Sequence, residues 1–500
     1  MKGVAMKHPY SIPDEIVRIP KKLAGSGFEA YLVGGCVRDM LQGIVPKDWD
    51  ATTNATPEDI IKIFPKTFYE NSYGTVGVVN EDVSETDASK ATLRVVEITP
   101  YRTEGKYTDF RRPDEITFAK TLEEDLERRD FTMNAIAYSV TRETFIDPYG
   151  GMRDIELKVV RAVGDPHARF QEDALRLMRA VRLANDLSFS IEDRTILALK
   201  EHAPLLSKIA VERIQDELNK VIMGKNPMRG IIMMRDLGLL KYILPEMEDG
   251  IACEQNGDHI YDVWEHNLRA LQHSADRGWA LHVRLAAMFH DVSKPETRRW
   301  SDEKKDWTFY GHDVVGGRVS ERIMKRLKYS SELIETVSLL VRYHLFFSDI
   351  EKITLSAVRR LVRNVGETLV WDLMDVRSCD RIGMGRPKET PYRLRKYHSM
   401  IEEAMRAPVS VGMLKTDGTR IMKLLEEKPS IRLGWILHAL LEEVLDDPKK
   451  NTEEYLDART KELSGLKDAE LRSLGEEGKG KKAEREEAEL KIIRDKYGVK

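Results

Sequence analysis

The chain has 500 residues, with 80 Lys or Arg, 84 Asp or Glu and a net charge of −4. This length allows three or more domains. The near balance of charge excludes a globally basic protein, so any nucleic-acid surface must be a local patch. The three cysteines (Cys36, Cys253 and Cys379) form no CxxC pair, which argues for a reducing compartment and against a cysteine zinc site. No apolar run approaches a membrane span and no long apolar h-region opens the chain, so we expect a soluble, cytoplasmic protein.

The pattern of apolar residues divides the chain into two parts with different predicted secondary structure. Up to about residue 155, short β-branched runs alternate with turns, as is typical of an α/β domain. From Asp165 onward helical periodicity dominates almost to the end. Residues 461–500 alternate charges and are interrupted by Gly475, Gly478 and Gly480, which predicts a solvated or fraying helix.

Residues 31–50 combine a glycine turn with two aspartates. An apolar run enters Gly34-Gly35, a short amphipathic segment follows, and Gly43 can end it, which predicts a strand, a tight turn and a helix. Paired glycines let backbone N–H groups approach a phosphate. In a following strand, Asp48 and Asp50 would share a face roughly 6–7 Å apart. Such a pair can hold two divalent ions about 4 Å apart, although either feature alone is more often a simple turn or a solvated strand edge.

A second group of charged residues, 127–130, precedes an apolar run. Arginine suits bidentate phosphate contact, and aspartate suits a ribose hydroxyl, which makes Arg129 and Asp130 candidates for nucleotide binding. A helix N-terminus with surface ion pairs would explain the same residues. The segment alone leaves both explanations open.

Charged residues recur every three positions from Asp173. On one helix Asp173, Arg176 and Arg179 would form a curving ridge, with Arg182 carried toward the far side, because each step of three drifts about 60°. Salt bridges on an exposed helix, each worth about 0.2–0.5 kcal/mol, would give the same spacing. Base recognition is the other explanation. An aspartate accepts from the exocyclic amine of cytosine or adenine while an arginine donates to the ring nitrogen, and such a contact discriminates by about 1–3 kcal/mol.

Histidines and aspartates gather in the second half of the chain, at His266, His290, Asp291, His312, His344 and Asp380. An adjacent His-Asp pair that closes an apolar helix, with a histidine upstream and an aspartate downstream, resembles the HD metal-dependent phosphohydrolases. The resemblance implies that His266, His290, Asp291 and Asp380 hold one metal, and that His312 and His344 complete a second site or contact a phosphate. Imidazole and carboxylate ligands suit several divalent transition metals as well as Mg²⁺. A bound metal would lower the pKa of water for attack on a phosphoester.

Together, the glycine–aspartate segment, Arg128-Arg129-Asp130 and the Glu-Asp-x-x-Arg motif at 172–176 resemble the polymerase-β-like nucleotidyltransferases. The match is closest to class II tRNA nucleotidyltransferases, the bacterial CCA-adding enzymes and their poly(A) polymerase relatives, and covers nearly everything from residue 29 to 451. It implies an α/β polymerase-β-like nucleotidyltransferase head followed by an all-α neck, body and HD region. Residues 101–114 match the family's flexible loop, which helps the switch to ATP. Residues 147–151 and 212–214 match structural segments.

The resemblance also implies roles for individual residues. Asp48 and Asp50 would be the catalytic carboxylates and would hold two Mg²⁺ ions. The implied nucleotide-binding residues are Gly34, Gly35, Arg38, Arg129, Asp130, Asp173, Arg176, Arg179 and Arg182. Within this set Asp173 and Arg176 would choose the base. The implied partners are the tRNA 3′ end, CTP and ATP.

We expect five parts along the chain: a head (1–155), a neck with base-selecting helices (156–225), a body or connector (226–255), an HD domain (256–385) and a helical C-terminal region with a charged end (386–500). The predicted function is Mg-dependent, protein-templated addition of CCA to tRNA, with phosphohydrolase activity in the HD domain as a second candidate. Three alternatives stay open. The first is a poly(A) polymerase or an enzyme that adds only the terminal A, the second an HD phosphohydrolase with an RNA-docking head, and the third a non-catalytic tRNA-binding protein.

Overall fold

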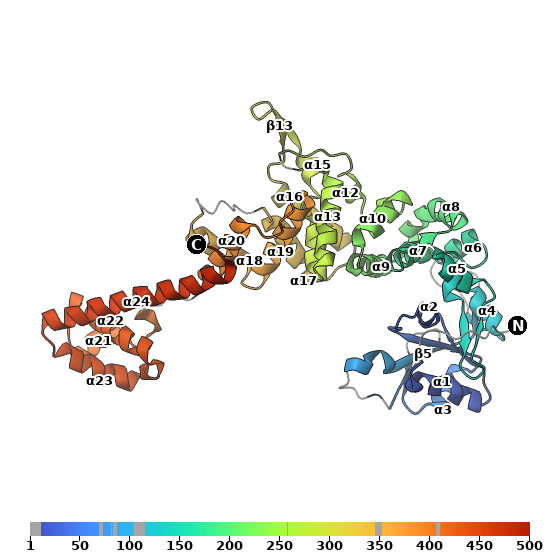
Figure 1. Ribbon diagram of the computed structural model, residues 1–500, viewed down its shortest axis with the longest axis horizontal. Helices are drawn as coiled ribbons and strands as arrows, with labels where there is room; N and C mark the ends of the chain where they lie inside the picture. The colour runs from blue at the N-terminus through green and yellow to red at the C-terminus, as the bar shows by residue number, and fades with distance from the viewer. Residues whose placement is uncertain are drawn as a thin grey trace. The chain divides into compact units, whose positions relative to one another are not determined.

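The computed structural model describes residues 12–69, 74–81, 83, 88–104, 116–257, 259–345, 353–406 and 411–500. The chain forms two units, the first made of Met1–His344 with Asp375–Pro387 and the second of Leu345–Met374 with Lys388–Lys500. The predicted α/β head followed by helical regions is confirmed (Figure 1). The finer division into five parts stays a prediction.

A mixed sheet forms the centre of the head. In the described part of the chain its order is β3-β4-β5-β2-β1-β8-β9. The strands are β3 (Thr67–Tyr69), β4 (Val76–Val79), β5 (Val95–Pro100), β2 (Trp49–Thr53), β1 (Ala30–Val33), β8 (Ala137–Ser139) and β9 (Thr144–Ile146). Only the β2–β5 pair is parallel, with Asp50 opposite Glu97, while the other neighbours run antiparallel. Every residue of β1 is buried, so this strand lies at the core of the sheet.

Short helices connect the strands and pack on this sheet. They are α1 (Asp14–Gly25), α2 (Gly35–Leu41), α3 (Pro57–Ile63), α4 (Leu122–Glu127) and α5 (Gly151–Leu157), with the 3₁₀ turns η1 (Ala88–Leu93) and η2 (Thr132–Asn134) and the ladder of β6 (Arg102–Glu104) and β7 (Ile116–Phe118). In α1 the buried residues Ile16, Ile19, Pro20 and Leu23 follow helical spacing and form its inner face. The predicted strand, turn and helix at 30–41 are present, and Gly43 with φ +70° follows the end of α2.

The neck consists of helices joined to the head by β10 (Val159–Val160), which pairs with β11 (Ser190–Ile191). Its helices are α6 (Pro166–Glu172), α7 (Leu175–Asp186), α8 (Asp193–His202), η3 (Ala203–Lys208), α9 (Val211–Met223), α10 (Pro227–Asp236), α11 (Leu240–Ile243) and α12 (Pro245–Glu248). The expectation of one helix running through Asp173 is wrong. Asp173 is extended (φ −137°, ψ 102°) and caps the C-terminal end of α6, and its carboxylate accepts from the Leu175 N–H at the start of α7 at 3.0 Å.

The HD region follows within the same unit. Its elements are α13 (Val263–Asp276), α14 (Leu281–Phe289), α15 (Lys294–Thr297), the hairpin of β12 (Arg299–Ser301) and β13 (Asp306–Thr308), α16 (His312–Arg326), α17 (Ser331–Tyr343) and the end of α19 (Leu369–Gly383). Arg284 of α14 is buried and donates to the Ile222 and Gly224 carbonyls at 2.9 and 3.0 Å. It thereby provides donors for backbone carbonyls at the C-terminal end of α9 and joins α14 to the neck.

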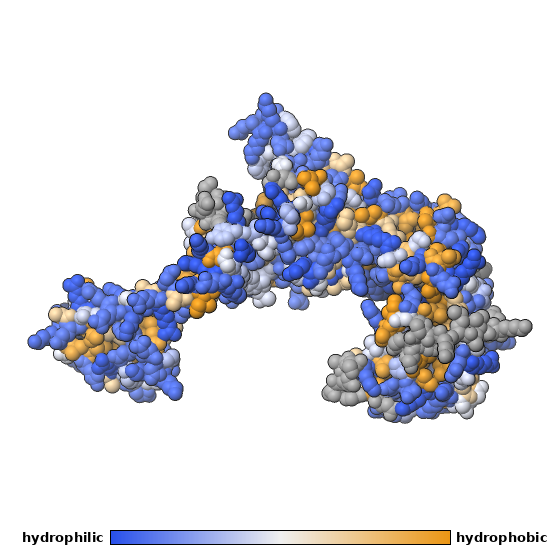
Figure 2. All heavy atoms as spheres, in the orientation of Figure 1, coloured by the Kyte–Doolittle hydropathy of each residue, from blue (hydrophilic) through white to orange (hydrophobic). Residues whose placement is uncertain are grey.

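The second unit is helical in its described part. It contains α18 (Leu355–Val365), α20 (Tyr392–Met405), η4 (Val411–Met413), α21 (Gly418–Leu425), α22 (Ile431–Asp446), η5 (Pro448–Lys450), α23 (Glu453–Ser464) and α24 (Asp468–Tyr497). Its core includes Ile421, Ile436, Leu440 and Leu456. The face of α21–α24 seen in Figure 2 is largely hydrophilic, with apolar side chains visible between the helices.

The charged end at 461–500 is helical and largely exposed to solvent, as predicted for a solvated helix, but its long helix is not interrupted at its glycines. Residues 468–497 form α24, which packs along α22 and reaches α20. A Cβ at Gly475 would lie 2.8 Å from the Trp435 Cα, and one at Gly478 would lie 2.4 Å from the His438 carbonyl oxygen. These two glycines therefore allow two helices to approach closely, instead of interrupting one. Among the described residues, no helix combines the length and apolar character needed to cross a membrane.

Candidate functional site

The glycine turn brings three predicted site residues together. Gly34 follows β1 with φ +82° and ψ −136°, a conformation that favours glycine. A Cβ added at Gly34 would lie 3.3 Å from the Arg129 Nη1 and 3.5 Å from the Asp50 Oδ2. The turn therefore lies directly against one predicted catalytic carboxylate and one predicted nucleotide-binding arginine.

The two aspartates occupy different environments. Asp50 lies in β2 and is half-buried, whereas Asp48 is exposed and precedes the strand. The expected strand position is thus wrong for Asp48, because the ladder with β5 begins at the Trp49–Val96 pair. Burial raises the pKa of the Asp50 carboxyl, Arg129 lowers it and the neighbouring charge of Asp48 raises it further. A buried carboxylate repelled by a second one is the kind of donor set that a divalent cation stabilises, so these residues fit the expected metal.

A third carboxylate was missed by sequence reasoning. Glu97 on β5 is the ladder partner of Asp50. Each of the two residues stands between buried neighbours on its own strand, so both side chains lie on the same face of the sheet. The sequence signal for Glu97 was its place within the β-branched run from Val95 to Ile98, which predicts a strand with one charged side chain. It could not be used, because the sequence does not say that β5 pairs with β2.

Arg129 is held in place by Asp125, a second residue that sequence reasoning missed. Asp125 is fully buried and accepts from Arg128 Nη2 at 2.6 Å, Arg129 Nη2 at 3.1 Å and the Thr52 hydroxyl at 3.3 Å. Burial raises the pKa of Asp125, but Arg129 and Arg128 outweigh it and leave that pKa lowered. The Arg129 Nε is buried and has no hydrogen-bond partner among the described residues, so this guanidinium keeps a donor for an anionic ligand.

A chain of polar contacts runs from α2 to the neck. Arg38 donates to Asp39 and to the Asn134 side-chain oxygen at 2.9 Å, and Asn134 donates to Asp130 at 3.1 Å. Arg179 of α7 completes the chain with two bonds to Asp130 Oδ2, at 2.9 and 2.6 Å. Burial raises the pKa of Asp130, yet Arg179 and Asn134 hold it well below its usual range. The structure thus joins Arg38, Asp130 and Arg179 in one network.

The proposed base-selecting pair lies where α6 meets α7. Arg176 is 7% exposed and donates to the Arg169 carbonyl (3.1 Å), Glu172 (2.7 Å) and the Arg128 carbonyl of the head (2.9 Å). Asp173 accepts two bonds from Arg213 of α9, at 3.2 and 2.8 Å. Arg213 belongs to a segment predicted to be structural, and the structure places it on the carboxylate of Asp173.

Arg182 is the predicted residue that the structure turns away from this group. Its Nε donates to Glu217 of α9 at 2.7 Å, and its Nη1 lies 3.7 Å from Asp186. It therefore joins α7 to α9. The predicted flexible loop at 101–114 lies largely outside the described residues; Tyr101, at its start, is buried and donates to Glu29 at 3.2 Å.

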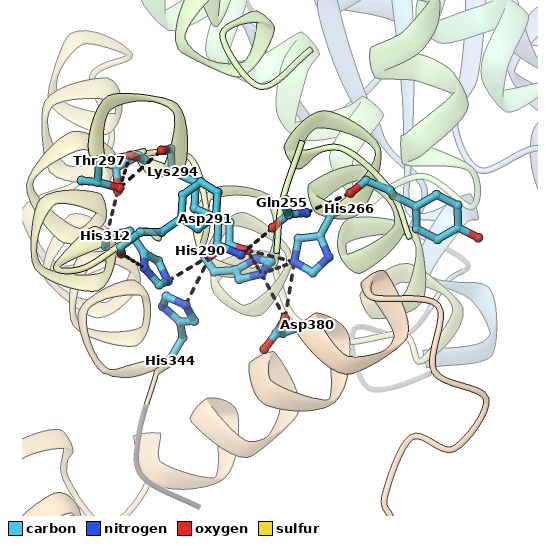
Figure 3. Close-up of polar contacts among 12 residues, drawn as sticks. Gln255, His266, His290, Asp291, Lys294, Thr297, His312, His344 and Asp380 are labelled. Carbon is cyan, nitrogen blue, oxygen red and sulfur yellow. Dashed lines mark hydrogen bonds and ion pairs between the residues drawn. The ribbon is translucent and has the colours of Figure 1, made fainter. Parts of the chain in front are cut away.

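The HD residues converge in the second cluster (Figure 3). His266, His290, Asp291 and Asp380 are all buried, and their ligand atoms lie within 4.8 Å of one another. The His266 Nε2 lies 2.8 Å from the His290 Nε2, 3.1 Å from Asp291 Oδ2 and 3.4 Å from Asp380 Oδ1. α13, α14 and α19 thus bring together residues separated by more than a hundred positions.

Asp291 also belongs to a second group with His312 and His344 (Figure 3). Its Oδ1 lies 3.3 Å from the His312 Nε2 and 3.6 Å from the His344 Nε2. The Nδ1 atoms of His290, His312 and His344 each contact a backbone carbonyl at 2.6–2.8 Å, which favours tautomers with a free Nε2 lone pair facing Asp291.

The donor chemistry of this cluster fits metal ions. The Asp291 Oδ2 is buried, 3.1 Å from the His266 Nε2 and 2.6 Å from the Lys294 ammonium. Burial raises the pKa of Asp291, and Lys294 and His290 outweigh it so that the pKa lies well below its ordinary value. Asp291 is therefore an ionised carboxylate that belongs to both clusters of histidines. This arrangement is suited to bridging two cations.

Comparisons with known proteins agree with this arrangement. Residues 30–161 match the poly A polymerase head domain, 188–251 the probable RNA and SrmB-binding site of polymerase A, and 263–382 the HD domain. The crystal structure of the Bacillus stearothermophilus CCA-adding enzyme in complex with CTP is similar at 28% identity and a TM-score of 0.58, covering 92% of this chain and 98% of that one.

Two curated relatives extend the comparison. The CCA-adding enzyme of Geobacillus kaustophilus is 43% identical over 239 residues, which is 48% of this chain and 55% of that protein, so the chain spans about half of its length. The CCA-adding enzyme of Lactococcus lactis is 45% identical over 294 residues, covering 58% of this chain and 69% of that enzyme. With this identity over more than two thirds of a relative, and with the matching head, the chain belongs to the CCA-adding enzyme family of nucleotidyltransferases.

Proposed function

We propose that the chain adds C, C and A to the 3′ end of tRNA, using CTP and ATP. The observation that carries the proposal is the convergence of Gly34, Asp50 and Arg129 beside a neck that presents Asp173 and Arg176. The first group supports phosphate chemistry and the second supports a choice of base. We place this activity in the cytoplasm, where a tRNA substrate would be met.

The transfer step uses the head. Asp48 and Asp50 are the residues that would hold Mg²⁺, which supplies activation of the attacking 3′-hydroxyl and stabilisation of the departing pyrophosphate. The Gly34-Gly35 turn offers backbone N–H groups to the triphosphate, and Arg38 and Arg129 contribute donors. Arg129 already has one buried N–H without a partner among the described residues, so it can bind a phosphate without breaking its bond to Asp125.

The choice of base uses the junction of α6 and α7. Asp173 would accept from the exocyclic amine of cytosine or adenine, and Arg176 would donate to the ring acceptor. Arg213 holds the Asp173 carboxylate from one side. Asp130 and Arg179 would contact the sugar and phosphates, while Arg182 supports α7 from its far side.

We propose metal-dependent phosphoester hydrolysis as a second activity, carried by the HD cluster. Its six buried ligands, Asp291 among them, favour this activity, and none of them belongs to the transfer site. The cluster would take one or two divalent transition metal ions, which supply a bound water of lowered pKa.

One experiment tests the transfer proposal and its nearest rivals. Transcripts ending before CCA, after C and after CC are incubated with each nucleotide singly and in pairs, and the products are sequenced. CCA completion supports the proposal. Addition of A only to the transcript ending in CC, or of long A tails to every transcript, would instead show the A-adding enzyme or the poly(A) polymerase. No addition to any transcript would contradict a transferase.

A further inference from the structure

A third group of metal-ligating side chains lies in the neck, apart from both sites described above. It consists of His167 in α6 with Glu201 and His202 at the end of α8. The His167 Nδ1 lies 3.2 Å from the His202 Nε2 and 3.5 Å from the Glu201 Oε2. All three ligand atoms fall within 4.8 Å of one another.

These separations match those of ligands on one tetrahedral cation. Two nitrogens at about 2.0–2.1 Å from such a metal lie about 3.3–3.4 Å apart. The observed 3.2 and 3.5 Å fall on either side of this value. The HD cluster of the same chain shows nitrogen–oxygen separations of 3.1–3.7 Å, so the two clusters share one spacing.

The local structure places and exposes the three ligands. Asp165 caps α6 and Pro166 starts it, so His167 lies in its first turn, while α8 packs against α6 and ends at His202. His202 is buried, whereas the His167 side chain is 42% exposed and that of Glu201 65% exposed. One ligand is thus fixed by packing, and the other two can close on an ion that enters from solvent.

We propose that His167, Glu201 and His202 bind one divalent transition metal ion of the zinc, nickel, cobalt or copper class, with water completing the coordination. Two imidazole nitrogens and one carboxylate favour these metals over Mg²⁺, which prefers oxygen ligands. A direct hydrogen bond between the two imidazoles is the alternative explanation of the 3.2 Å contact. It requires one ring to donate and makes no use of Glu201.

Such an ion would tie α6 to α8. α6 ends at Glu172, whose carboxylate accepts from Arg169 at 2.5 Å and from Arg176 at 2.7 Å, and Asp173 follows directly. The ion would therefore restrain the helix that leads into the proposed base-selecting pair. Metal binding by these three residues does not depend on either proposed activity, because the ligands lie outside both sites.

The full-length chain provides the test. With Mg²⁺ in large excess to fill the transfer site, Zn²⁺ binding is measured by isothermal titration calorimetry, and Co²⁺ is used as a spectroscopic probe. We expect His167→Ala and His202→Ala each to bind one Zn²⁺ fewer than the wild-type chain. His282→Ala, which removes an imidazole outside the three clusters, serves as the control. The same loss should appear in an Asp291→Asn background, where the HD cluster no longer competes.

Two further variants separate coordination from hydrogen bonding. His167→Cys keeps a metal ligand and should retain the ion, whereas His167→Gln keeps a hydrogen-bonding side chain and should lose it. Zn²⁺ should also slow amide exchange in residues 166–172 of the wild-type chain and leave the His167→Gln chain unchanged. An unaltered number of bound ions in His167→Ala and His202→Ala would overturn the proposal.

Discussion

Asp50 carries a charge that its own fold disfavours. It is half-buried in β2, next to the exposed Asp48, and Arg129, which lowers its pKa, is already bonded to Asp125. The structure thus keeps a carboxylate poorly compensated where Gly34 leaves room beside it. A side chain at Gly34 would fill that space. In the proposed transfer, the turn and the acidic pair would together hold a metal-bound triphosphate against β2.

Removal of the Asp173 carboxylate should loosen the choice of base. If Asp173 accepts from the exocyclic amine as proposed, Asp173→Ala should cut discrimination against UTP and GTP by roughly 5- to 150-fold, the equivalent of about 1–3 kcal/mol. Single-nucleotide incorporation on a transcript ending before CCA measures the ratio of kcat/KM values. Asp193→Ala, an exposed aspartate in the first turn of α8, is the matched control. Unchanged selectivity in Asp173→Ala would refute its role as the template.

The bond between Asp130 and Arg179 should make stability depend on pH in the acid range. The pKa of Asp130 in the folded chain lies below that in the unfolded chain, about 3.9, so the pair stabilises above that value and loses its effect as the pH falls through the folded pKa. Asp130→Asn should reduce the free energy of unfolding at neutral pH by about 1–3 kcal/mol. Urea titrations at several pH values measure this difference, which should shrink below about pH 4. An equal difference at pH 3 and pH 7 would argue against the assignment.

At the scale of elements, α24 shows what sequence patterns leave undetermined. Three glycines among alternating charges look like interruptions, since glycine weakens an isolated helix. Which glycine contacts a neighbouring helix depends on the partner helix. The partner of α24 is α22, a separate segment, and the pattern of α24 alone does not reveal it. Gly475 and Gly478 face Trp435 and His438, whereas a Cβ at Gly480 would meet nothing within 4 Å.

These glycines provide a prediction with an internal control. Gly478→Ala would place a Cβ 2.4 Å from the His438 carbonyl oxygen, so the helices must separate, at a cost of about 1–3 kcal/mol. Gly480→Ala has free space and should stabilise the helix by up to about 1 kcal/mol. Thermal unfolding of the two variants should shift in opposite directions. Equal shifts would show that α24 does not pack against α22 as described.

The neck shows a similar limit. The spacing of Asp173, Arg176 and Arg179 predicted one helix with all three residues near the nucleotide. In the structure they contact Arg213, the Arg128 carbonyl and Asp130, respectively, and their place at a nucleotide stays a prediction. The break before α7 was missed because Asp173 acts as a cap, which no period of three reveals. Motifs with dense local chemistry were readable from the sequence. Asp125 and Glu97 were not, because their importance depends on pairing between distant segments. Arg213 was expected only as part of a structural segment, and its contact with Asp173 joins residues that are far apart in the sequence.

At the scale of the molecule, the first unit contains two separate acidic centres. One is open and built on a strand, with Asp48 exposed beside Asp50. The other is closed and built on helices, with each of its six ligands buried. A polymer end can be extended at an open site, whereas a closed site of imidazoles suits a small phosphoester. We therefore expect two activities that can be removed independently.

Paired isosteric substitutions test this independence. Asp50→Asn removes the charge of one carboxylate in the transfer site and should lower CCA addition by roughly 10³-fold, since several kcal/mol of charge stabilisation are lost. It should leave hydrolysis of p-nitrophenyl phosphate or its diester with Mn²⁺, Co²⁺ or Ni²⁺ unchanged. Asp291→Asn removes the carboxylate shared by both histidine groups, so hydrolysis should disappear while CCA addition continues with Mg²⁺. Treatment with a chelator followed by Mg²⁺ alone should reproduce the Asp291→Asn behaviour in the wild-type chain. If instead Asp291→Asn abolished CCA addition in a folded chain, the HD cluster would be part of the transfer machinery.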